Sequence, residues 1–146
     1  MTDNYSAVET AVYNILVALT TYFPAGSGTV TYGDYSPLDA GRDRCAVITP
    51  GGFVRERGTM SSNLMIWTIN VDIFQRYVNS ANTYSAFKTM RAAIIDAFAD
   101  TVGVADVVIE DVKADENPAM ITKQGTNTIT HLVQSIQIVC QQYVEV

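Results

Sequence analysis

Charged residues are scarce in this sequence. Asp, Glu, Lys and Arg make up 16% of the 146 residues, whereas apolar residues make up 48%, a low share of charge for a water-exposed surface. Such a composition predicts either that partners cover part of the surface or that the exterior is neutral and rich in Thr, Ser, Asn and Gln. The net charge of −6 argues against ordinary DNA binding, which needs clustered Lys and Arg to neutralise phosphates.

The residues that usually build catalytic and metal sites are also few. His131 is the only histidine, so a metal site with two imidazoles is excluded. Cys45 and Cys140 are the only cysteines, and their strand-like surroundings predict buried free thiols. No dinucleotide fingerprint, Cys-x-x-Cys pair, His-Glu-x-x-His helix or nucleophile elbow is present. We therefore expect no enzymatic activity, no cofactor and no bound metal.

Weaker chemical patterns have simpler interpretations. The glycines between Pro24 and Asp43 lack the Gly-Lys-Ser/Thr ending of a phosphate loop, and the aspartates there lack the spacing of an EF-hand. Asp96 and Asp100 lie one helical turn apart, a spacing common on solvated helix faces. A Cys45–His131 catalytic pair is conceivable, but nothing in the sequence brings the two residues together.

Long hydrophobic runs are missing as well. No uncharged apolar run approaches the roughly 20 residues of a membrane span, and no basic region followed by an apolar core marks a signal peptide. We expect a soluble protein, made in a reducing compartment, that has no membrane partner.

The strongest positive signal is an alternating stretch from Leu64 to Tyr77. Trp67, Ile69, Val71 and Ile73 fall on one side, with polar residues between them. A period of two predicts a strand with one buried and one polar face. We expect these four residues to lie beneath the helices of the fold.

The remaining pattern predicts two helices and several further strands. Apolar residues recur at three- and four-residue spacing in Asn4–Phe23 and in Ser80–Asp100. Strand-like stretches are Thr29–Tyr32, Cys45–Thr49, Phe53–Arg57 after a Pro-Gly-Gly turn, Val104–Val112 and Thr128–Val146. The sequence therefore predicts an α+β fold: residues 1–146 form a single domain, in which an antiparallel-rich mixed β-sheet has two α-helices packed on one face.

Two segments look too open to belong to the core, namely Gly52–Asn63 and the long loop Lys113–Asn127. Long loops in small domains are often functional, and we expect the second to be ordered only on assembly. An exposed, solubilising hairpin is the plainer interpretation of the first. The candidate residues for an interface with a neighbouring subunit or another protein are Arg55, Glu56, Arg57, Asp115, Glu116 and Lys123.

The layout resembles the tail-terminator proteins of long-tailed bacteriophages, especially those of lambda-like siphophages. Three features underlie the resemblance: the N-terminal helix leading through a Gly/Asp loop to Cys45–Ile48, the stretch Trp67–Phe74 followed by a loop and a helix, and the terminal strand ending at Val146. The resemblance covers nearly the whole chain as pattern and length.

The resemblance implies a structural role in the virion neck, after assembly in the host cytoplasm. Such proteins form a ring, typically a hexamer, at the head-proximal end of the tail tube, where they end polymerisation of the major tail protein and meet the head connector or stopper protein. Genome DNA would pass through the ring without specific binding, which suits an acidic chain. The alternatives are another neck component, such as a head-completion or stopper protein, and a small α+β ligand-binding domain or enzyme.

Overall fold

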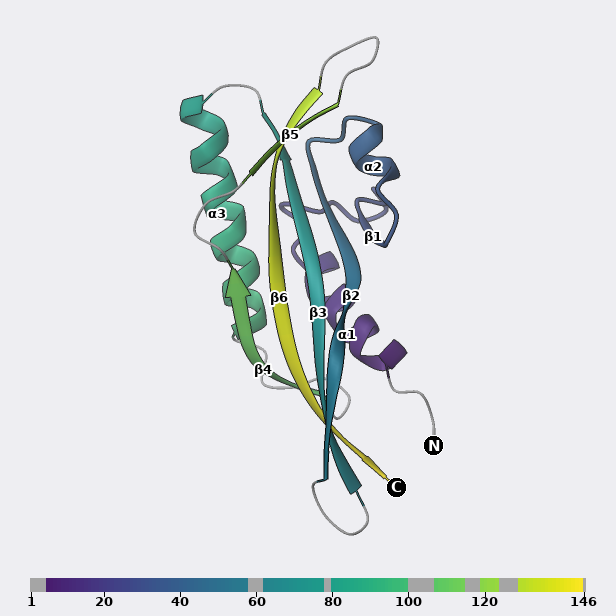
Figure 1. Cartoon of the computed structure of the whole chain (residues 1–146). Helices are drawn as coiled ribbons and strands as arrows, with labels where there is room; N and C mark the ends of the chain where they lie inside the picture. Colours follow the sequence, from purple (N-terminus) through teal and green to yellow (C-terminus); the bar gives the residue numbers. More distant parts are fainter. Residues whose placement is uncertain are drawn as a thin grey trace.

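Three long strands form the centre of the structure (Figure 1). The computed structural model describes residues 5–57, 62–77, 80–99, 107–114, 119–123 and 129–145. The long strands are β2 (Arg44–Arg57), β3 (Ser62–Arg76) and β6 (Ile129–Glu145). Shorter strands are β1 (Val30–Tyr32), β4 (Val107–Ala114) and β5 (Ala119–Lys123). All six belong to one sheet in the order β1-β2-β3-β6-β4, with β5 paired to β6 as well.

The sheet is mixed and mostly antiparallel, as the sequence predicts. Only β1 pairs in parallel, with the first part of β2. β3 and β6 pair over fifteen residues, from Ser62 opposite Glu145 to Arg76 opposite His131, without a register shift. β6 is therefore an interior strand, which protects a long uncharged stretch from edge-to-edge aggregation.

The main core lies between one face of this sheet and two helices, α1 (Tyr5–Val17) and α3 (Ser80–Ala99). The helices contribute buried side chains at three- and four-residue spacing, and the sheet contributes the alternating row of β3. Trp67 is 7% exposed, and Ile69, Val71 and Ile73 are fully buried, which confirms the predicted register. The buried helical residues of this core cluster are Val8, Val12, Leu16, Phe87, Met90, Ile94 and Phe98.

On the opposite face of the sheet, the described residues form one small apolar cluster, which lies beneath a short helical turn. The single turn α2 (Ser36–Asp39) brings Leu38 against a small cluster of Cys45, Val47 and Phe74. The Tyr35 ring meets the Phe74 ring edge-on, with 6.0 Å between their centroids. Cys45 thus belongs to the small cluster and Cys140 to the main core, so the two buried thiols are free as predicted.

Several predicted boundaries are wrong. The first helix ends at Val17 rather than Phe23, because β-branched Thr20 and Thr21 and then Pro24 disfavour helix. Phe23 is nevertheless buried, since a turn joins its N–H to the carbonyl of Leu19 at 2.9 Å.

Two further corrections concern the strands. Cys45–Thr49 and Phe53–Arg57 are one strand, β2, and the Pro-Gly-Gly sequence forms a bulge within it instead of a turn. The predicted loop Lys113–Asn127 contains the end of β4 and the whole of β5. Residues 115–118 and 124–127 of that loop lie outside the described residues, as do residues 58–61 of the first open segment.

Candidate assembly surface

The two candidate segments lie at opposite ends of the sheet. Backbone pairing places Arg55, Glu56 and Arg57 opposite Met65, Leu64 and Asn63, which in turn face residues 142–144 near the end of β6. Lys123 pairs with Ile129, the first residue of β6. At about 3.3 Å per residue along β6, the two places are roughly 45 Å apart. Asp115 and Glu116 lie outside the described residues.

We call the first place the hairpin end, formed by Phe53–Arg57 and Ser62–Met65. Its clearest surface feature is Phe53, which is 63% exposed. The Phe53 ring lies beside the buried Trp67, with 5.3 Å between the ring centroids. A large aromatic ring that is held on one side and open on the other suits a contact with another protein.

We call the second place the β5 end, formed by Ala119–Lys123 and Ile129–Val133. Met120 and Ile121 are 50% and 44% exposed. Because successive residues of a strand point to opposite faces, β5 offers apolar surface on both sides. Figure 1 shows β5 at the other extremity of the sheet from the start of β3.

The sequence analysis missed these exposed apolar residues because it selected only charged residues in the open segments as interface candidates. A usable signal was present in each case. Phe53 directly follows two glycines, and Ala119-Met120-Ile121-Thr122 is a strand-like run between charged residues.

Between the two ends, part of the sheet face opposite α1 and α3 carries polar side chains. Asp72 accepts hydrogen bonds from the Tyr35 hydroxyl at 3.0 Å and from the Ser135 hydroxyl. A hollow of about 280 Å³ lies beside Ser135 and Gln137 and is also bordered by Lys113. The side chains described on this face are mostly polar and include charges of both signs, Asp72 and Lys113, a composition that suits contact with water or with another subunit.

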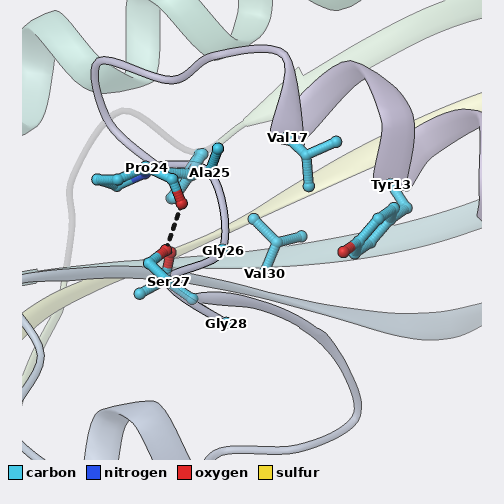
Figure 2. A pocket seen from close by; sticks show the side chains of 10 residues that line it. Tyr13, Val17, Pro24, Ala25, Gly26, Ser27, Gly28 and Val30 are labelled. Atoms are coloured by element: carbon cyan, nitrogen blue, oxygen red, sulfur yellow. Dashed lines mark hydrogen bonds between the residues drawn. The ribbon is translucent and has the colours of Figure 1, made fainter.

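A larger hollow of about 450 Å³ lies between the end of α1 and the loop 24–29 (Figure 2). Val17 of α1 and Val30 of β1 lie opposite each other there, and Tyr13 closes one side. The Ser27 hydroxyl donates a hydrogen bond of 2.6 Å to the Pro24 carbonyl and so fixes the loop. None of the ten lining residues is charged, so the hollow offers no acid, base or cation to a ligand.

The described residues do not assemble a recognisable reaction centre. Burial raises the pKa of the Cys45 thiol to about 12 and that of the Cys140 thiol to about 11, which keeps both thiols protonated and poorly nucleophilic. The His131 Nε2–H donates to the Arg42 carbonyl at 2.9 Å and not to either thiol. In the same part of the chain, no three His, Cys, Asp or Glu residues gather where a metal ion would be held.

Comparisons with known proteins add no family. A scan against protein-family models finds no match to this chain, and a search of curated proteins finds no relative. Among the described helices, none combines the length and the apolar character needed to cross a membrane.

Proposed function

We propose that this protein is a structural subunit of a phage virion, of the tail-terminator type that its sequence resembles. In this role it forms a closed ring of identical subunits, a hexamer by analogy with that family, at the head-proximal end of the tail tube. The ring ends polymerisation of the major tail protein and offers its other side to the head connector or stopper protein.

The observation that favours this role is the mismatch in length between the sheet and its helices. The 17 residues of β6 span roughly 56 Å at about 3.3 Å per residue. The 20 residues of α3 span only about 30 Å at 1.5 Å per residue. The helices are therefore too short to cover the sheet along its whole length, and exposed apolar side chains lie near both of its ends.

Two separated ends suit a protein that must join two different partners. Phe53 at the hairpin end and Met120 with Ile121 at the β5 end supply exposed apolar surface. A subunit that bound only one partner would need only one such place. The polar sheet face between the ends, together with the net charge of −6, suits a ring through which DNA passes without binding.

Closure into a ring limits the number of subunits at the tube end. A head-to-tail contact between identical subunits grows without limit unless rotation closes it. The tube stops growing because the outward face of the ring binds the head connector or stopper protein and not a further copy of the major tail protein.

Charge reversal at Arg55 and Arg57 tests the proposal. We expect the Arg55→Glu/Arg57→Glu variant to fold as a monomer but to lose ring formation or tail joining, because forked arginine contacts would become repulsive. Lys88→Glu is the matched control, since Lys88 is exposed on α3, away from both ends. Normal assembly by the double variant would remove the hairpin end from the interface.

A second candidate, a small ligand-binding domain, is favoured by one observation only. The hollow between α1 and the loop 24–29 measures about 450 Å³, within the range of roughly 300–1,000 Å³ for ligand sites. Native mass spectrometry of the purified protein distinguishes the two candidate functions. A stoichiometric small molecule that remains bound would favour the second candidate, and a ligand-free ring would favour the first.

A further inference from the structure

A third hollow, of about 220 Å³, lies near the β5 end, where β2 begins. It is bordered by Arg42, Asp43 and Arg44 on one side and by the turn at Thr21 and Tyr22 on the other. The chain has only nine basic residues, and two of them border this one hollow. Neither Arg42 nor Arg44 forms an ion pair with any of the described residues.

The Arg44 side chain is held in a fixed orientation. Its Nε–H donates a hydrogen bond of 2.8 Å to Oε1 of Gln75, its neighbour across β2 and β3. Its guanidinium carbon lies 5.5 Å from the centre of the Tyr22 ring, within the range of a cation–π contact. Gln75 is itself buried. These two contacts use Nε and one face of the guanidinium, and they leave its terminal nitrogens to bind a ligand.

The backbone beneath Arg42 is also anchored. Its carbonyl accepts the hydrogen bond from the buried His131, and the following residue, Asp43, accepts a 2.7 Å hydrogen bond from the Arg76 N–H through its carbonyl. The exposed Arg42 side chain therefore extends from a fixed point beside Arg44. A pair of guanidinium groups on anchored backbone is an arrangement that favours an oxyanion.

The surrounding groups select a carboxylate rather than a phosphate. Asp43 reduces the formal charge at the hollow to +1, which one carboxylate neutralises. The Ser27 hydroxyl gives its proton to the Pro24 carbonyl, and Thr29, 2.8 Å from Ser27, donates to Ser27 in turn. Neither hydroxyl has a proton left for the additional oxygens of a phosphate. A planar carboxylate needs only the two parallel N–H groups that an arginine fork supplies.

We propose that the hollow at Arg42 and Arg44 is a binding site for the carboxylate of an Asp or Glu side chain on a neighbouring copy of this chain. The occupant follows from charge complementarity, because each copy has 15 acidic and nine basic residues and so presents surplus carboxylates. The choice of occupant rests on the ring proposed above, whereas the carboxylate chemistry rests on the hollow alone.

Nuclear magnetic resonance of the purified protein tests the chemistry without any assembly. The probe is N-acetylglutamate amide, which has only the side-chain carboxylate, and the neutral control is N-acetylglutamine amide at the same ionic strength. We expect the glutamate probe to shift the backbone amide signals of residues 42–44 saturably and the glutamine probe to leave them unchanged. Inorganic phosphate that binds more tightly than the glutamate probe would overturn the choice of carboxylate.

Variants of the two arginines test whether these side chains bind the glutamate probe and so cause the shifts of the amide signals. Arg44→Gln should weaken binding by roughly tenfold or more, as expected for loss of charge-assisted hydrogen bonds. Arg44→Lys keeps the charge but not the forked pair of N–H donors. It should bind the glutamate probe more tightly than Arg44→Gln does and more weakly than the unaltered chain does. Arg42→Gln alters an exposed side chain, so it keeps the test valid if changes at Arg44 unfold the protein. Lys88→Gln should bind as the unaltered chain does, and equal binding by all variants would overturn the site.

Sedimentation velocity then tests whether a neighbouring copy of the chain supplies the carboxylate. The Arg42→Gln/Arg44→Gln variant should lose self-association that the Lys88→Gln variant retains. Normal ring formation by the double variant would show that the carboxylate in the site does not come from a neighbouring copy. If the unaltered chain forms no ring but still binds the glutamate probe, the proposed function fails while the carboxylate site stands.

Discussion

At the residue scale, His131 shows how a single side chain can join distant segments. It is 2% exposed in β6, and its Nε2–H reaches the Arg42 carbonyl just before β2. We expect His131→Ala to lower the free energy of unfolding by about 1–3 kcal/mol, because a paired carbonyl loses its partner. His131→Gln keeps a donor and should lose less. Equal stability of the alanine variant in urea denaturation would show that this hydrogen bond is dispensable.

The two thiols predict a loss of stability at alkaline pH. Burial raises the pKa of Cys45 and Cys140 to about 12 and about 11, above the ordinary value of 9.0. The folded state therefore keeps protons that the unfolded state releases. The stabilising effect is complete below pH 9 and declines as the pH rises toward the folded pKa values.

The measurement is unfolding free energy against pH for the unaltered chain and for a Cys45→Ala/Cys140→Ala variant. The variant should lose less stability above about pH 9, although burial also raises the pKa of Tyr32 and Tyr35 in both proteins. A thiol reagent at about pH 8 should react only after denaturation. Rapid reaction of the folded protein would contradict the burial of both thiols.

At the element scale, the bulge in β2 depends on the absence of a side chain at Gly51. A Cβ atom there would lie 2.9 Å from the Thr68 carbonyl oxygen and 3.0 Å from the Thr68 methyl carbon. We expect Gly51→Ala to cost about 1–3 kcal/mol, because the backbone of two paired strands must move. Adding Thr68→Ser removes the methyl contact alone and should restore stability only in part. Full restoration would mean that the backbone contact is harmless.

The elements also show what the sequence can and cannot predict. The alternating β3 row and the α3 stripe were predictable, because each pattern is local and buries one face. The end of α1 was not, since Phe23 keeps its buried place through a turn instead of helix. β5 was missed because a five-residue strand shows its partner only through long-range pairing with β6.

The position of the candidate site was less predictable than the fold. Arg55 and Lys123 were both recognisable as charges in open segments, but their separation depends on the register of β2, β3 and β6. The alternating pattern predicts which face a strand residue occupies, but it does not show which strands pair or distinguish registers that differ by two residues. The hollow at Arg42 and Arg44 was hard to predict for the same reason, because Arg44 and Gln75 are distant in sequence and adjacent in the sheet.

At the scale of the whole molecule, the two ends predict two separable defects. Phe53→Ser alters the hairpin end, and Met120→Ser/Ile121→Ser alters the β5 end. Because these side chains are largely exposed, thermal stability should change little in both variants. Each variant should fail at a different junction, one with the tail tube and the other with the head connector. Loss of the same junction in both would show that the ends do not serve different partners.

The central claim, that this chain caps a tail tube, is tested most directly by electron microscopy. Purified protein is mixed with tubes assembled from the major tail protein, and the tube ends and lengths are recorded. The proposal predicts rings on one end of each tube and an arrest of further growth. A protein that stays monomeric, leaves both ends bare and allows the tubes to keep growing would contradict it.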